Sequence, residues 1–173
     1  MLEEEGTSLL ERAPRNSIWI FLPYLLLQVS DGLCASIQST IYPLESSKKG
    51  LTASQIGPEV GIFFLSQIIV CPLTGRWLSV WGAKKLYPAG FILAGGTSVL
   101  FGLLQWVSDP TLFLVFSYLL RFLGGVGSAV LFTSNLAILL AKFPDLESTV
   151  MAWCQASYNF GLAVGPILGL VAR

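Results

Sequence analysis

Five long apolar runs, separated by short polar segments, are the feature that most limits how this chain can fold. A helix needs about 20 apolar residues to cross a hydrocarbon core about 30 Å thick. Inside a bilayer the backbone groups have to bond within their own segment, which favours helices. The sequence therefore predicts an all-α membrane protein, embedded in the lipid bilayer, whose transmembrane helices cover about 17–42, 56–80, 87–107, 111–141 and 149–171.

Composition supports this class and excludes several others. Of the 173 residues, 54% are hydrophobic and 12% are charged, whereas an average soluble domain is about 25% charged. The formal net charge is zero, so we expect no nucleic-acid partner. The chain has no histidine and no Cys-x-x-Cys sequence, which predicts neither a metal site nor a disulfide framework.

Residues 1–16 are polar, start with acidic residues and become basic beside the first apolar run. This composition predicts a disordered tail with a basic end near the membrane. Within it, Glu5-x-x-x-Leu9-Leu10 matches an acidic di-leucine sorting pattern. Short matches of this kind also arise by chance.

The basic residues between the runs indicate the orientation of the chain. Cytoplasmic loops carry an excess of Lys and Arg. A cytoplasmic amino terminus puts the larger set of basic residues in the cytoplasm, namely Arg12, Arg15, Arg76, Lys84, Lys85 and Lys142, and leaves Lys48, Lys49 and Arg173 on the opposite side. We therefore expect the amino terminus to be cytoplasmic.

Arg121 is a single cation inside the fourth run. At 1.5 Å per residue it lies roughly 15 Å past Thr111, near the middle of the hydrocarbon core. Burying a charge there costs between about 2.5 and 17 kcal/mol, so such residues face a partner or a water-filled cavity. The alternative is structural, in which Arg121 pins its helix to a carbonyl or a carboxylate.

Two polar stripes follow from helical spacing. Gln28, Asp31 and Gln38 share one face of the first helix, and Arg121, Ser128 and Asn135 recur every seven residues in the fourth. Because a carboxylate inside a membrane is by default a functional candidate, we expect Asp31 to be a functional residue on a wet or paired face of the first helix. The alternative is that Asp31 only caps a break at Gly32.

Other polar residues are candidates for the lining of a cavity. They are Gln38, Ser128, Asn135, Gln155 and Tyr158. The competing explanation is hydrogen bonding between helices, worth about 0.6 kcal/mol for each bond. Glu59 lies at the start of the second run, where a solvated carboxylate at the membrane interface is expected.

Three stretches resemble signature motifs of the major facilitator superfamily, in the right order. The connector Gly75-x6-Gly82, followed by Lys84 and Lys85, resembles the loop signature between helices two and three. The other two are similar to signatures of proton-coupled antiporters in helices four and five: Arg121-x-x-x-Gly125-x-Gly127 and Gly161-x3-Gly165-Pro166-x2-Gly169. In the loop signature, Ser79 and Val80 replace the usual Asp and Arg.

Three further segments resemble the vesicular amine transporter family, closest to its vesicular polyamine transporter branch. They are Gly82-Ala-Lys-Lys, the Ser108-Asp-Pro turn and Ala141-Lys-Phe-Pro. The resemblance implies the amino-terminal part of a major facilitator fold, with five of twelve helices. It also implies a transporter rather than an enzyme, with a proton gradient as energy source and no cofactor. In such a transporter we expect Asp31 and Arg121 to couple protons to substrate. The expected substrates are small cationic amines or polyamines, carried in exchange for protons into an acidic vesicle.

The resemblance covers the chain from about residue 17 onward but not the carboxyl-terminal half of the family fold. The chain is expected to be a fragment or a short isoform, and that missing half would be its partner. A second hypothesis follows: a non-transporting membrane protein that associates with or modulates the full-length carrier.

Overall fold

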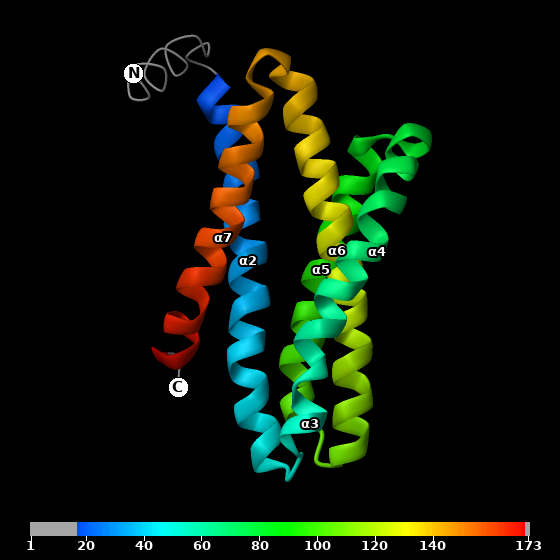
Figure 1. Cartoon of the computed structure of the whole chain (residues 1–173), viewed down its shortest axis with the longest axis vertical. Coiled ribbons are helices and arrows are strands. Elements are labelled where there is room, and N and C mark those ends of the chain that lie inside the picture. Colours follow the sequence, from blue (N-terminus) through cyan, green and yellow to red (C-terminus); the bar gives the residue numbers. More distant parts are fainter. Residues whose placement is uncertain (1–16, 172–173) are drawn as a thin grey trace.

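The computed structural model describes residues 17–171, and every regular element in that range is a helix (Figure 1). The five long helices are α2 (Ser17–Lys48), α4 (Pro58–Trp81), α5 (Ala83–Leu103), α6 (Pro110–Lys142) and α7 (Glu147–Val171). Three short ones, α3 (Ala53–Ile56), η1 (Leu104–Trp106) and η2 (Pro144–Leu146), lie between them. The expected all-α fold is confirmed.

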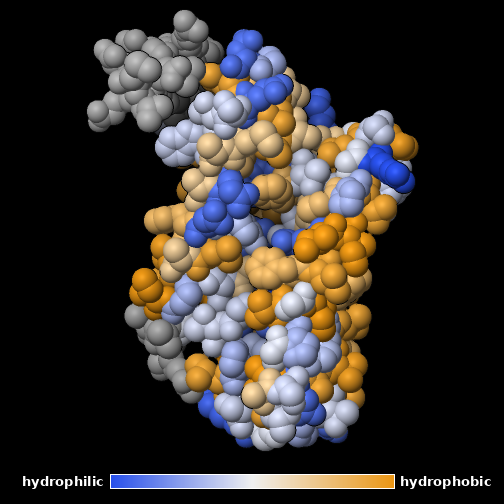
Figure 2. All heavy atoms as spheres, viewed as in Figure 1, coloured by the Kyte–Doolittle hydropathy of each residue, from blue (hydrophilic) through white to orange (hydrophobic). Residues whose placement is uncertain are grey.

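The long helices are long enough to span a membrane. Within the part of the chain that the structure describes, three helices are long and apolar enough to cross a membrane: Ala53–Trp81, Ala83–Trp106 and Pro110–Lys142. Helices α2 and α7 are 32 and 25 residues long, which also exceeds the length of about 20 residues that a bilayer requires. On the visible face, hydrophobic side chains cover much of the middle, and hydrophilic ones gather toward both ends (Figure 2).

The long helices form two groups. Helix α6 packs along both α4 and α5, while α2 packs along α7. Far fewer contacts join α2 to α5 and α6, or α6 to α7. Figure 1 shows α2 and α7 side by side, separated from the other group along much of their length. The polar residues that concern function lie where α2 faces α6.

Glycines of two signature motifs mark the closest helix approaches. A Cβ on Gly127 would lie 2.6 Å from the backbone nitrogen of Ala94 in α5, and one on Gly165 would lie 2.6 Å from Cβ of Ser36 in α2. A Cβ on Gly161 would overlap the carbonyl oxygen of Val29. Gly125 meets α4 equally closely, whereas Gly169 makes only ordinary contacts, the nearest at 3.8 Å. The small residues therefore let backbones approach.

Two boundaries were predicted wrongly. Pro43 does not end the first helix, because α2 continues to Lys48. A proline removes only one backbone hydrogen bond, and buried Tyr42 anchors this end of α2 by stacking on Phe113 at 5.7 Å between ring centroids.

The predicted connector from Gly75 to Lys85 is also mostly helical. Helix α4 runs to Trp81, and α5 starts at Ala83 with Lys84 and Lys85 exposed in its first turn. Only Gly82 turns the chain, with a φ of 77° that favours glycine. Gly75 lies within α4 and packs against nothing nearby.

Candidate functional site

The two polar stripes meet across the interface between α2 and α6. The Ser128 hydroxyl donates a hydrogen bond of 2.6 Å to a carboxylate oxygen of Asp31. Farther along, the Asn135 amide donates to the Gln28 side chain at 3.1 Å. Helices α2 and α6 run in opposite directions (Figure 1). The later residue of the α2 stripe, Asp31, therefore meets the earlier residue of the α6 stripe, Ser128, and Gln28 meets Asn135.

Helix α4 adds a third member to the Asp31 contact. The Gln67 amide donates to the Ser128 hydroxyl at 2.9 Å, so Ser128 links α4 to α2. All three side chains are at least half-buried. Among residues 17–171, Asp31 has no ion-pair partner.

Arg121 pairs with a residue that was expected elsewhere. Its Nε donates to a carboxylate oxygen of Glu59 in α4, and the exposed fractions of the two side chains are 2% and 1%. Its Nη2 donates to the Ser39 hydroxyl of α2 at 3.2 Å. The guanidinium carbon also lies 4.9 Å from the ring centroid of Phe101 and 5.6 Å from that of Phe63.

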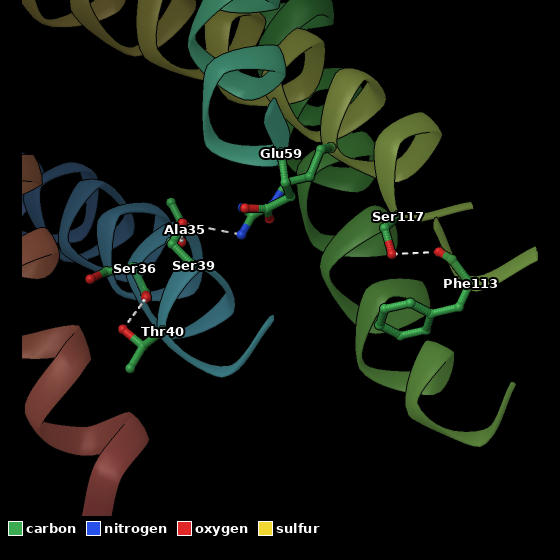
Figure 3. Close-up of polar contacts among 8 residues, drawn as sticks. Ala35, Ser36, Ser39, Thr40, Glu59, Phe113 and Ser117 are labelled. Carbon is green, nitrogen blue, oxygen red and sulfur yellow. Dashed lines mark hydrogen bonds and ion pairs between the residues drawn. The ribbon is translucent and has the colours of Figure 1, made fainter. Parts of the chain in front are cut away.

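The prediction of Glu59 as a solvated interfacial carboxylate is therefore wrong. The helix begins earlier than expected, because α3 passes into α4 through Gly57, whose backbone is α-helical. Glu59 consequently lies more than a turn inside the helical segment, facing the α2 region that holds Ser39 (Figure 3). Its burial requires a cation, and Arg121 supplies one.

Asp31 and Arg121 line one small cavity. It has a volume of about 10 Å³ and also touches Gln38, Ser98 and Gly124. Gln38 and Ser98 also line a larger, mostly apolar cavity of about 390 Å³ between α2 and α5. The two opposite charges thus border the same space, although each hydrogen-bonds to a different partner.

The two remaining residues predicted to line the cavity differ in burial. Tyr158 of α7 is buried edge-on against Phe132, with ring centroids 6.3 Å apart. Its hydroxyl is fully buried. Gln155 is exposed and donates to Asn159 of its own helix at 3.4 Å, so it does not reach the α2–α6 interface. The sorting residues Glu5, Leu9 and Leu10 lie outside the described residues.

Three functional candidates were missed: Ser39, Glu59 and Gln67. A signal for the second was present, since Glu59 and Ser66 are seven residues apart and lie on the buried face of α4, the same spacing that identified Arg121 and Ser128. Within 17–171, no group of His, Cys, Asp or Glu is placed to hold a metal ion.

A comparison with protein-family models decides the family. The model described as Major Facilitator Superfamily matches residues 24–172. The chain belongs to the major facilitator superfamily. This confirms the resemblance carried by the three motifs, and it makes the chain a member of a transporter family rather than an enzyme.

Several curated superfamily members are similar to it. MFS-type transporter SLC18B1 of Homo sapiens is 30% identical over 155 residues, which is 90% of this chain and 34% of the relative. The Mus musculus protein of the same name is 28% identical over 91% of this chain and 34% of its own length. Multidrug resistance protein 2 of Bacillus subtilis is 32% identical over 69% of this chain and 28% of its own length.

The chain therefore spans about a third of the length of the curated relatives it matches. No solved structure matches it significantly. Superfamily membership and the apolar helices make this a multi-pass membrane protein.

Proposed function

We propose that this chain forms the amino-terminal part of a proton-coupled antiporter for organic cations, with amines or polyamines as substrates. Asp31 is the group that exchanges a proton for the substrate. The observation that carries the proposal is that Asp31 is a half-buried carboxylate with a neutral hydrogen-bond donor, Ser128, and no ion pair among the described residues.

The chemistry follows from charge. A carboxylate enclosed by helices is stabilised when a cation neutralises it. Both a proton and an ammonium group can do so, but not at the same oxygen atoms together. Binding one therefore displaces the other, which is the requirement for exchange. Arg121 keeps its charge at all working pH values, so it does not carry the proton. Its proposed role is to tune the electrostatics of the cavity and to link helices across it by hydrogen bonds.

The relatives support the substrate class only by analogy. One is named a multidrug resistance protein, and the SLC18B1 relatives are named as transporters of the superfamily without a substrate. The acidic vesicle membrane, with the amino terminus in the cytoplasm, is the location in which this exchange would accumulate amines.

The test is Asp31→Asn in the full-length protein reconstituted into liposomes that are acidic inside. We expect uptake of labelled spermidine and labelled serotonin to fall by about tenfold or more, because the amide cannot neutralise either cation. Asp145→Asn is the matched control, since Asp145 is exposed in η2. Uptake by Asp31→Asn equal to that of the control would remove Asp31 from the mechanism.

A further inference from the structure

Three charged side chains lie close together where α2, α4 and α6 meet: Asp31, Glu59 and Arg121. Glu59 and Arg121 neutralise each other in an ion pair that is almost fully removed from solvent. Asp31 is left with a hydroxyl donor from Ser128. The sum is one negative charge that has no permanent counter-ion among the described residues.

Arg121 could in principle supply that counter-ion. Both residues line the same small cavity, and the partner of Asp31 on α6, Ser128, is seven residues from Arg121. That separation is about 10 Å along the helix, which a long arginine side chain and an aspartate can bridge between them. If the guanidinium turned toward Asp31, the carboxylate would no longer need a proton or an amine.

Several contacts hold the guanidinium away from Asp31. Glu59 accepts from Nε, and Ser39 accepts from Nη2 at 3.2 Å. The Phe63 and Phe101 rings lie 5.6 and 4.9 Å from the guanidinium carbon. Only Glu59 among these carries charge, so it supplies the main electrostatic hold on Arg121.

We propose that Glu59 is a positioning residue: by holding Arg121, it keeps Asp31 without an internal counter-ion, so that a proton or a cationic substrate has to bind there. This inference rests on the proposed exchange role of Asp31. It assigns the buried carboxylate of α4 to the site through Arg121, the residue with which Glu59 is paired.

The other charged or titratable groups around Asp31 do not replace this role. Cys34 lines the same cavity from α2, and Tyr158 is the buried titratable group of α7. Neither group is a cation. Helix α5 contributes Ala94 and Ser98 to the cavity, and these carry no charge.

The experiment compares spermidine binding by the purified full-length protein and three variants. Glu59→Gln releases Arg121, so we expect spermidine affinity to fall by about tenfold or more, in line with the effect of a nearby opposite charge. Glu59→Asp keeps the charge and should stay within about threefold of the unmodified protein. The double variant Glu59→Gln/Arg121→Gln removes the competing cation. Its spermidine affinity should regain at least half of the fold-loss seen in Glu59→Gln.

Binding rather than transport is measured, because Arg121 has its own proposed part in coupling. A double variant that binds as weakly as Glu59→Gln would overturn the inference. A merely structural role for the ion pair predicts recovery in the double variant as well, but it predicts no change in the protonation of Asp31, so the infrared readout described below separates the two. Unchanged affinity in Glu59→Gln would overturn it as well. If Glu59→Gln does not fold, the double variant decides alone: retained binding supports the inference and lost binding overturns it.

A second readout separates this inference from the proposed function. Infrared spectra recorded over a pH range report protonation of the Asp31 carboxyl, identified as the band that Asp31→Asn lacks. We expect the pH of half-protonation to fall by about one unit or more in Glu59→Gln and to return in the double variant. If the protein binds no spermidine but this band moves as expected, the inference stands and the substrate proposal fails. If the band does not move, the inference fails.

Discussion

At the scale of single residues, the Arg121–Glu59 pair has an asymmetric energetic role. Both side chains have left water, and the desolvation that this requires offsets much of the attraction between them. Replacing both can therefore be nearly neutral. Replacing one leaves the other as a buried, uncompensated charge, which costs about 3–5 kcal/mol.

We accordingly expect Arg121→Gln to lower the free energy of unfolding by about 3 kcal/mol or more, and the double variant with Glu59→Gln to lose clearly less. Chemical denaturation of the purified protein measures both. Arg76→Gln is the matched control, because Arg76 is exposed on α4. Equal losses in the single and double variants would show that the ion pair stabilises the fold in its own right.

Spacing along one helix predicts which residues share a face, but not which residue of another helix they meet. The seven-residue recurrence placed Arg121, Ser128 and Asn135 together. The partner of Arg121 on α2 is Ser39 rather than the neighbouring Gln38, since that choice depends on how two helices are rotated and shifted. Glu59 was wrongly predicted to lie at the membrane surface, because a run of hydrophobic residues locates the start of a helix only to within a few residues.

At the scale of elements, the crossing of α2 and α7 depends on two facing glycines. A Cβ on Gly32 would overlap the carbonyl oxygen of Tyr158, and one on Gly161 would lie 2.9 Å from the backbone nitrogen of Leu33. Backbone cannot move aside as a side chain can. The two helices would therefore have to separate to admit even one methyl group.

Gly161→Ala should therefore destabilise the protein by about 1–3 kcal/mol, as overpacking does. Gly95→Ala is the matched control: a Cβ at Gly95 meets nothing within 4 Å, so this change should be neutral or slightly stabilising. The midpoints of thermal unfolding of the two variants make the comparison. A Gly161→Ala variant as stable as Gly95→Ala would mean that the helices can separate at no cost.

Motifs predicted these elements better than they predicted the turns. Close packing at Gly125, Gly127, Gly161 and Gly165 agrees with the small residues expected at helix crossings. The connector around Gly75 was misjudged because glycine and basic residues favour a turn locally, whereas hydrogen bonding within the membrane favours continuing a helix.

At the scale of the whole molecule, the turns sort to two ends. The α4–α5 turn and the α6–α7 turn lie at the end where α2 begins, and the α2–α3 turn lies at the other end (Figure 1). Lys84, Lys85 and Lys142 are therefore near the first end, and Lys48 is near the second. This arrangement fits the proposal of a cytoplasmic amino terminus.

Single cysteines test that orientation. In a protein whose Cys34, Cys71 and Cys154 are replaced by serine, Lys84→Cys should react with an impermeant maleimide as soon as the plasma membrane is opened. Lys48→Cys should react only after the vesicle membranes are opened too, because the proposed topology places it on the luminal side. The reverse order of labelling would invert the proposed topology.

The pairing of α2 with α7 also bears on how the protein is synthesised. Gly32 and Gly161 are about 130 residues apart, and a ribosome adds about 5–20 residues per second. Helix α2, which carries Gln28, Asp31 and Gln38 on its polar face, is therefore made on the order of 10 s before α7, its main packing partner. We therefore expect slower translation to lengthen the time for which the polar face of α2 has no α7 packed against it.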